Sequence, residues 1–351
     1  MSEESKSPES PESPERSVAR RLFGNLLALL RTFVYLLGIA WASGAIYYDA
    51  PLPSDSGLDR GLLAGGYALV VLLTLVALGS RRRRFFGWVV AVALVAIPWG
   101  LKKPTRKADW KPTCSRLPSA TIEGDLVTFH NFRNFTYDET GKPTERWETR
   151  VLDLSKLEGL DFAHHVLRHE LLAHPLLCFD FGDAGHAAFS VEVRYRNDQE
   201  FSPLRGLYKQ YNLIYLVGDE GDFLHERVAV RNEPVRLYRS TYPLERIREI
   251  FRETIDAMNA LQERPMFYNS LTANCTTSYI RQAPAEKRPR FDYRIILNGL
   301  IESLLYEREL ISTDGLSFED LVRRATINEA AREAHGDPSY SELIRQDRPG
   351  F

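Results

Sequence analysis

Three long apolar segments dominate the first hundred residues. They cover residues 26–48, interrupted by Arg31, residues 61–79 and residues 85–100. As helices rising 1.5 Å per residue, the first two are long enough to cross a hydrocarbon layer of about 30 Å. The third is short and needs its flanks or a locally thinner bilayer. Because residues 61–79 carry no charge and no polar stripe, the pattern predicts three transmembrane helices within residues 22–100 rather than helices of a soluble core.

The segment before these helices has a different composition. Residues 1–21 repeat Ser, Pro and Glu without an aromatic residue, which predicts a disordered tail. The tail is long and acidic, and no small-residue cleavage site clearly ends the first apolar segment, so that segment is expected to remain as an anchor.

Basic residues predict the orientation in the membrane. Arg16, Arg20 and Arg21 precede the first apolar segment and four arginines occupy 81–84, whereas the loop at 51–60 is acidic. The excess of positive charge on cytoplasmic loops then predicts a cytoplasmic N-terminus. Three crossings place the rest of the chain in the periplasm or outside the cell. The expected location is the bacterial inner (cytoplasmic) membrane.

The hydrophobic pattern changes after a linker at 101–119 that contains several prolines. Residues 120–351 begin with short alternating runs typical of strands. In "AAFSVEVRYR" one face carries apolar side chains and the other carries Ser190, Glu192 and Arg194. Further strands are expected at 211–217, 223–230 and 234–240, with a solvated turn "GDEGD" between the first two. The simplest arrangement is an antiparallel sheet.

Helical periodicity follows the strands. Residues 243–264 repeat apolar positions three and four apart, which predicts an amphipathic helix on the sheet. Asn274 is expected to cap the next helix, which begins in "NCTTSYIRQA". Further helices are expected at 293–309, 317–324 and 327–335. Strands followed by helices indicate an α+β domain.

Composition narrows the chemistry. The net charge of −2 gives no overall bias toward nucleic acid, and no glycine-rich phosphate loop points to a nucleotide or organic cofactor. Of the three cysteines, Cys114 and Cys178 can pair in an oxidising compartment and leave Cys275 over. In the first turn of a helix, the unpaired N–H groups and the helix dipole favour the thiolate, so Cys275 is a candidate nucleophile. A core-filling thiol is the alternative.

A thiol nucleophile needs a base. His174, in the apolar run "LLAHPLLCFDF", comes shortly before the strand that carries Glu192, and the two can face each other across neighbouring strands. Cys275, His174 and Glu192 then form a nucleophile, a base and an orienting carboxylate. Asn274, Arg194 and Ser190 are candidates for substrate binding or an oxyanion hole, although backbone N–H groups at the helix start suffice.

The histidine-rich stretch "HHVLRHELLAH" suggests a different chemistry. His165 and His169 stand four residues apart and can share a helix face, as metal ligands do. The motif HExxH is absent, so no metal site is expected. A non-catalytic membrane module that docks a partner through the acidic turn or the basic linker is another alternative.

Several segments resemble a known family. They are "HNFRNFTYD", "LLAHPLLCFDF", "FSVEVR", "GLYKQYNLIYLVGDEGD", "RPMFYNSLTANCTT" and "INEAAREAHGDPSYSELIR". In this order, over about residues 120–347, they are similar to the periplasmic domain family of Lnb, the lipoprotein intramolecular transacylase. The resemblance implies a papain-like thiol fold in which the histidine precedes the cysteine. Cys275 matches the nucleophile, His174 the base and Glu192 the third member.

The chain departs from the family pattern at two positions. Pro175 and Cys178 stand where members often have threonine and serine. Cys178 is therefore close in sequence to the expected site, where it either packs or forms a regulatory disulfide with Cys275.

The resemblance implies a membrane-anchored periplasmic enzyme with acyl-thioester chemistry on a lipoprotein or a lipid ester. No cofactor or metal is expected, and the partner is a lipoprotein or membrane lipid. A cell-envelope cysteine peptidase or amidase, with the same residues acting on an amide, is the alternative enzyme.

Overall fold

The computed structural model describes residues 14–51, 56–167 and 170–351. The chain divides into two compact units, Met1–Lys102 and Lys103–Phe351. Residues 1–13 of the expected tail lie outside the described residues.

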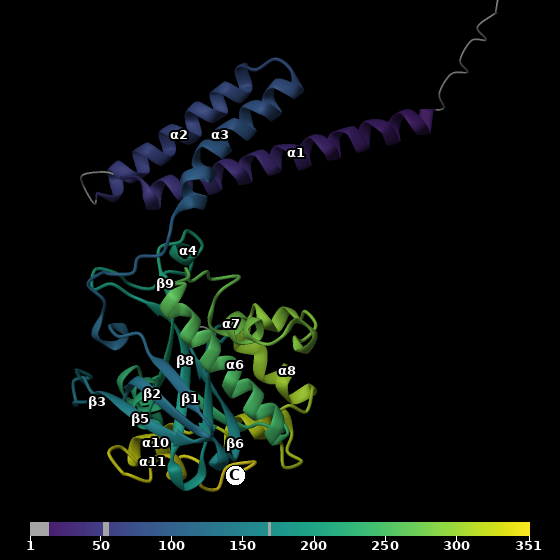
Figure 1. The fold of residues 1–351 in the computed structure, drawn as a ribbon. Helices are drawn as coiled ribbons and strands as arrows, with labels where there is room; N and C mark the ends of the chain where they lie inside the picture. Colours follow the sequence, from purple (N-terminus) through teal and green to yellow (C-terminus); the bar gives the residue numbers. More distant parts are fainter. Residues whose placement is uncertain (1–13, 52–55, 168–169) are drawn as a thin grey trace, which may run out of the picture. The chain divides into compact units, whose positions relative to one another are not determined.

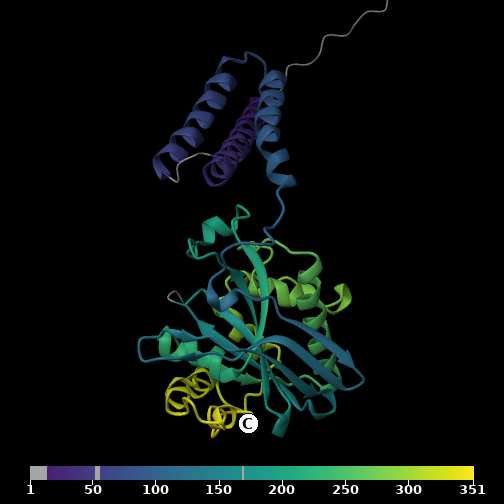
Figure 2. The ribbon, with the colours of Figure 1, turned by 60° about the vertical axis from the view of Figure 1, so that its left-hand side comes forward.

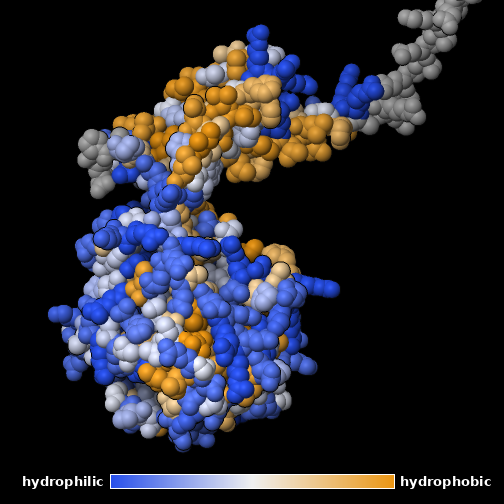
Figure 3. Space-filling model, viewed as in Figure 1, coloured by the Kyte–Doolittle hydropathy of each residue, from blue (hydrophilic) through white to orange (hydrophobic). Residues whose placement is uncertain are grey.

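The first unit consists of three helices, α1 (Pro14–Asp49), α2 (Gly57–Ala77) and α3 (Arg81–Leu101). Each has the length and composition of a membrane span. They pack through a small apolar cluster that includes Ile39, Val71 and Leu75. Most other apolar side chains of this unit face outward, and its surface is largely orange in Figure 3. A surface of this kind suits lipid rather than water.

Two helix boundaries differ from the expected ones. α1 begins at Pro14, within the predicted tail, because proline is favoured in the first helical turn and the residues that follow tolerate helix. α3 begins at Arg81 after the N-cap Ser80 and reaches 21 residues. The arginine-rich flank therefore supplies the length that the apolar segment lacked.

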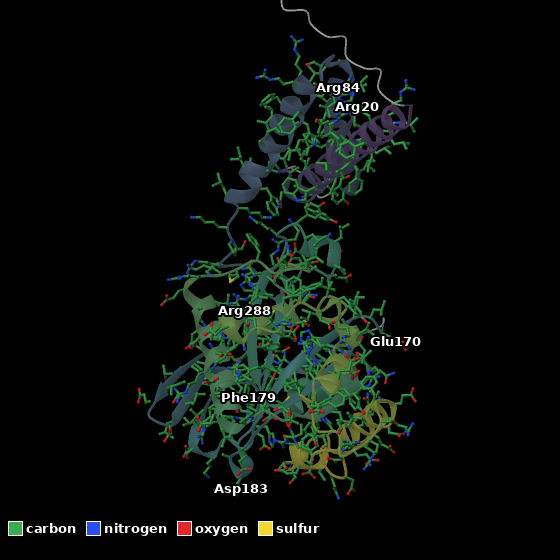
Figure 4. All side chains as sticks on the ribbon, turned by 90° about the vertical axis from the view of Figure 1, so that its right-hand side faces the viewer. Arg20, Arg84, Glu170, Phe179, Asp183 and Arg288 are labelled. Carbon is green, nitrogen blue, oxygen red and sulfur yellow. The ribbon has the colours of Figure 1, made fainter. Side chains whose placement is uncertain are left out.

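The basic residues gather at one end of this unit. Figure 4 shows Arg20 and Arg84 at the same end, where α1 and α3 begin. This arrangement agrees with three helices that run in alternating directions, which the predicted orientation requires.

The second unit is an α+β domain built on an eight-stranded sheet, with strand order β1-β2-β9-β8-β7-β6-β10 and β5 paired with β2. All pairs are antiparallel except β2 with β9, which meet in parallel at Arg133 and Gly218. Its strands are β1 (Ser119–Glu123), β2 (Leu126–Arg133), β5 (Trp147–Asp153), β6 (Gly159–Val166), β7 (Ala173–Asp180), β8 (His186–Arg194), β9 (Asn212–Gly218) and β10 (Val235–Arg239). β3 (Thr136–Tyr137) and β4 (Pro143–Thr144) form a separate hairpin.

The sheet has a core on each face. α6 (Leu244–Glu263) covers one face, where Phe251 packs against Phe129, Phe179 and Phe189. The other core includes residues of α5 (Glu220–His225), α10 (Asn328–Glu333), α11 (Tyr340–Leu343) and Ile344, which follows α11. α9 (Phe318–Arg324) contributes to a smaller cluster. Figures 1 and 2 show the short helix α4 (Pro203–Gly206) and the yellow C-terminal helices at opposite ends of this unit.

The predicted strand at 223–230 is wrong. The segment forms α5 and a π-helical turn, Glu226–Val230. Asp219 starts the helix by accepting a hydrogen bond from the Gly221 N–H at 2.9 Å. Phe223, Leu224 and Val228 then meet the core at helical spacing. The strands expected at 211–217 and 234–240 and the helix at 243–264 are confirmed as β9, β10 and α6.

The predicted solvated turn "GDEGD" is also wrong. Glu220 and Asp222 are 0% and 1% exposed. Glu220 pairs with Arg345 at 2.8 Å and Asp222 with Arg133 at 2.8 Å. The acidic residues are buried because each has a guanidinium partner from a distant part of the chain.

The helix expected at 293–309 is interrupted. It forms two 3₁₀ turns, Tyr293–Ile295 and Asn298–Leu300, and then α8 (Ile301–Glu307). The Gly299 N–H donates to the Leu171 carbonyl at 3.0 Å, and a Cβ at Gly299 would lie 1.9 Å from the Glu170 carbonyl oxygen. Because glycine has no side chain, Gly299 can lie directly against the backbone of Glu170 and Leu171, just before β7. This close contact explains why the helix is interrupted. The helices expected at 317–324 and 327–335 are confirmed as α9 and α10.

Candidate active site

Cys275 is the first residue of α7 (Cys275–Gln282). Asn274 caps this helix: its side chain accepts from the Thr277 N–H at 2.9 Å, and its own N–H donates to Thr277 Oγ1 at 2.9 Å. The predicted N-cap is confirmed. Because the Asn274 side chain also donates to the Ser270 carbonyl at 2.9 Å, its role is to fix the helix start. Cys275 as a whole residue is 7% exposed.

His174, Ser190 and Glu192 meet on one face of the sheet. His174 lies on β7 and the other two on the neighbouring β8, where Ser190 is in register with Leu176. His174 Nε2 is 2.7 Å from Ser190 Oγ and 3.1 Å from Glu192 Oε1. Ser190 Oγ donates to Glu192 Oε1 at 2.6 Å. The period of two along a strand brings these side chains to the same face.

His174 and Cys275 line the same pocket, and the interaction between their side chains favours the protonated imidazole. Since Nε2 already faces Ser190 and Glu192, Nδ1 is the ring nitrogen available to the sulfur. Burial by itself lowers the pKa of His174, but the charge of Glu192 and the neighbouring Cys275 outweigh it and raise the pKa to about 9. His174 is therefore protonated at neutral pH.

Arg227 supports the carboxylate. Its Nη2 donates to Glu192 Oε1 at 2.7 Å and to Ser190 Oγ at 3.2 Å, and its Nη1 donates to the Phe223 carbonyl at 2.7 Å. Burial by itself raises the pKa of Glu192, but His174, Arg227 and Arg231 hold it well below its usual range. Glu192 is thus a carboxylate at neutral pH.

Sequence reasoning missed Arg227 because it lies in the segment predicted as a strand. The helical spacing that follows Asp219 was the available signal.

Asn298 ties the two halves of the site together. Its Oδ1 accepts from the Ala173 N–H at 2.9 Å, and its Nδ2 donates to the Ala173 carbonyl at 2.6 Å and to Thr276 Oγ1 at 2.9 Å. Nδ2 is also 3.7 Å from Cys275 Sγ. One buried amide therefore joins the residue before His174 to the residue after Cys275. No pattern around Asn298 in the sequence pointed to this role.

A pocket of about 270 Å³ opens beside the cysteine. His174, Glu192, Asn274 and Cys275 supply polar groups to its lining. The rest of the lining is mostly apolar or aromatic: Leu167, Leu172, Ala173, Val191, Val193, Tyr195, Phe201, Pro203, Tyr268 and Ile296, with Arg231, Ser270 and Asn298. Polar groups converging in a mostly apolar pocket are typical of a ligand site.

Arg194 does not reach this pocket. Its Nε donates to the Cys114 carbonyl at 3.0 Å and its Nη2 to the Ser115 carbonyl at 2.6 Å, and its guanidinium lies 4.3 Å from the centre of the Trp110 ring. Arg194 therefore holds the segment that enters the domain, residues 110–115, against the end of β8.

The other two cysteines lie away from Cys275. All three cysteines are free and buried. Cys114 and Cys178 belong to the core on the side of α5 and α10, whereas Cys275 belongs to the core under α6. Burial raises the pKa of Cys178 well above its usual range. The disulfides considered from the sequence, Cys114 with Cys178 and Cys178 with Cys275, are not formed.

The helix face that His165 and His169 could share is not formed at His165. His165 lies on strand β6, and its Nε2 is 2.6 Å from Glu233 Oε2. Burial, Arg227 and His174 lower the pKa of His165 to about 2. His169 lies outside the described residues. Within the described ranges, no three His, Cys, Asp or Glu side chains form a group able to hold a metal ion.

Comparison with known proteins identifies the domain. The family model described as "Lnb N-terminal periplasmic domain" matches residues 143–303, a span that contains His174, Glu192, Cys275 and Asn298. No curated protein and no solved structure matches the chain. The resemblance seen in the sequence is thereby confirmed over residues 143–303, the part of the chain that is similar to the Lnb N-terminal periplasmic domain family.

Proposed function

We propose that this protein is a membrane-anchored periplasmic thiol acyltransferase. Cys275 is the nucleophile, His174 the general base and acid, and Glu192 the residue that orients the imidazole. One observation carries the proposal: a cysteine at a helix N-terminus lines the same pocket as a histidine whose Nε2 faces Ser190 and Glu192. This is the arrangement of an activated nucleophile, its base and an orienting group.

The first step is acylation of the thiol. The Cys275 sulfur attacks the carbonyl carbon of a lipid or lipoprotein ester, and a carbon–sulfur bond forms. When the tetrahedral intermediate collapses, the ester carbon–oxygen bond breaks and the alkoxide takes its proton from the His174 imidazolium. The products are a thioester on Cys275 and a lyso-lipid hydroxyl.

Backbone N–H groups at the start of α7 supply the oxyanion hole in this proposal. Asn274 caps the Thr277 N–H, so the N–H groups of Cys275 and Thr276 come before the capped position. The Asn298 amide is a poorer donor because both of its protons are engaged, with the Ala173 carbonyl and Thr276 Oγ1. Donors fixed before reaction stabilise developing charge without reorganisation.

The second step is transfer. A free amine, such as the terminal amine of the lipoprotein, attacks the thioester carbonyl while His174 removes one of its protons. The carbon–sulfur bond breaks, the acyl chain becomes an amide, and the thiolate–imidazolium pair is restored. Neither step needs a metal or an organic cofactor.

The substrate class rests on three supports. The matching family is named for a periplasmic domain of Lnb. The chain carries three helices fit to span a membrane, which hold the enzyme where acylated proteins and lipids occur. The walls of the pocket beside Cys275 are mostly apolar, which suits an acyl chain. A papain-like fold with the histidine before the cysteine belongs to the same proposal.

The test uses the full chain in detergent micelles with a synthetic diacyl lipopeptide. Fragmentation mass spectrometry should find one acyl chain moved from the glyceryl oxygen to the terminal amine. With a lipopeptide whose amine is acetylated, transfer is blocked, and the intact protein should gain the mass of one acyl group on Cys275. Hydroxylamine should remove that group.

Cys275→Ala tests the assignment, and Cys178→Ala, in the opposite core, is the matched control. If one acyl chain is released as a fatty acid and is not transferred to the amine, the enzyme is a hydrolase and not a transferase. A cut amide with both esters intact would favour the envelope peptidase. An active Cys275→Ala protein would refute the nucleophile.

A further inference from the structure

Exposed apolar residues lie in, or directly next to, the chain segments that line the pocket. Phe201, Leu204, Leu271, Ile296 and Leu297 are 48%, 54%, 56%, 47% and 37% exposed. Phe201 and Ile296 line the pocket itself, and the others adjoin the lining residues Pro203, Ser270 and Asn298 in the chain. We refer to these five exposed residues as the apolar rim.

The segments of the rim are held against one another. Ser270 Oγ donates to the Pro203 carbonyl at 2.7 Å, which joins the loop before α7 to α4. The Phe201 ring lies edge-on to Tyr268, with centroids 6.4 Å apart. Asn298 links the third segment to Thr276. The rim is therefore a surface built in advance rather than a set of unrelated loops.

The same end of the domain receives the chain from the third candidate span. Asn212, the first residue of β9, donates to the Thr105 carbonyl at 2.6 Å, and the Lys111 N–H donates to the Tyr195 carbonyl at 2.9 Å, just beyond β8. α4 and Phe201 lie in the connection between these two strands. Since α3 ends at Leu101, the four residue steps to Thr105 reach at most about 14 Å.

Basic residues accompany the apolar ones. Arg205 follows Leu204 directly and is exposed, and Arg281 on α7 is exposed as well. Guanidinium groups pair well with phosphate, and arginines beside apolar side chains are a feature of surfaces that lie in the headgroup region of a membrane.

We propose that the apolar rim is a membrane-docking surface that enters the bilayer spanned by α1, α2 and α3, so that the pocket opens toward the acyl chains. The occupant is the phospholipid surface itself. A short covalent connection to a candidate span, at the end of the domain that carries the rim, argues for this occupant over a soluble partner. The inference goes beyond the proposed function and does not depend on catalysis.

The test measures depth in the bilayer. The full chain with Cys275→Ala, whose remaining cysteines are buried, is given one spin label through Leu204→Cys or Leu271→Cys and reconstituted in vesicles of phosphatidylethanolamine and phosphatidylglycerol. Asp183→Cys is the control, because Asp183 is exposed and lies at the opposite end of the domain from α4 (Figures 1 and 4). Power saturation compares the accessibility of each label to oxygen and to a nickel chelate.

Labels at 204 and 271 should be several-fold more accessible to oxygen, relative to nickel, than the label at 183. Equal ratios at the three positions would overturn the proposal, as would rim labels shielded from both reagents, which would indicate a protein partner. The labelled protein lacks Cys275, so the depth measurement does not depend on enzyme activity. Failure of the proposed function and failure of membrane docking can therefore be distinguished. A second test uses the chain that retains Cys275. In it, the double variant Leu204→Asp with Leu271→Asp should have a lower rate of acyl transfer from lipopeptide in vesicles, with little loss of rate in detergent micelles.

Discussion

His174 and Glu192 meet across neighbouring strands, with Nε2 of the imidazole 3.1 Å from Oε1 of the carboxylate. The carboxylate and Cys275 raise the pKa of His174 to about 9 although burial opposes it. An enzyme that needs the imidazolium should therefore lose activity as pH rises through about 9.

Glu192→Gln should move this upper limb to lower pH, because the charge that favours the protonated ring is removed. The expected displacement is about 1 to 3 pH units. The pH profile of kcat/KM for the lipopeptide measures it. An unmoved limb would mean that Glu192 does not set the charge of His174.

The same linkage affects stability. A histidine with a raised pKa stabilises the fold fully below its unfolded value of about 6.5, and this contribution disappears as pH rises through about 9. In His174→Gln, the fall in the unfolding temperature of the domain between pH 6.5 and 9.5 should become shallower. Differential scanning calorimetry at several pH values measures the slope, with His130→Gln, an exposed histidine, as the control.

Alkylation of Cys275 should depend on His174. In His174→Ala, the rate with iodoacetamide at pH 7 should fall by roughly tenfold or more, because the imidazolium that stabilises the thiolate is absent. Mass spectrometry of the Cys275 peptide against time gives the rate. His130→Ala should leave it unchanged, and an equal rate in both variants would argue against the pair.

Removing Arg227 should destabilise the domain. In Arg227→Met, Glu192 and Ser190 lose a buried partner, at a cost of roughly 3 kcal/mol. For a domain of this size that lowers the melting temperature by about 6 to 12 °C. The double variant Arg227→Met with Glu192→Gln should recover part of the loss, since no unpaired carboxylate remains. Additive losses would show that the two side chains act independently.

Asn298→Ala should slow chemistry more than binding. The amide holds Ala173 and Thr276 together, and therefore holds His174 and Cys275 at a fixed separation. Looser placement of reacting groups by about 1 Å can cost roughly 100-fold in rate. We expect kcat to fall by about that factor while KM changes little. A rise in KM at constant kcat would instead assign Asn298 to substrate binding.

Oxidation should not join Cys178 to Cys275. The two thiols belong to cores on opposite faces of the sheet. After treatment with diamide, non-reducing peptide mapping should find no peptide that links them. Detection of that cross-link in the folded protein would contradict the arrangement of the two cores.

The hydrophobic pattern was sufficient to predict most elements. An unbroken apolar run predicts a span, alternation along 187–196 predicts β8, and spacing of three and four predicts α6, because in each case one local period determines which face is buried. Asn274 was predictable as a cap for the same local reason. His174, Glu192 and Cys275 were predictable as candidates by residue type and by resemblance.

The prediction for residues 218–230 was wrong for a physical reason. The acidic and basic residues of this segment are buried against Arg133, Arg345 and Glu192, which are distant in sequence, so composition suggested a turn and a strand where the fold has a helix. For Arg194, the predicted face of β8 was correct. Its side chain, however, binds the segment that enters the domain and does not reach the pocket.

By itself, the sequence determined the three apolar helices, the periods of the main strands and helices, and the residue types that can act on a carbonyl. Only the tertiary structure decided which of those residues meet. The bond from His174 to Glu192, the support from Arg227 and the tie through Asn298 join positions far apart in the chain. No local period records such a contact, because it depends on how the sheet and helices pack.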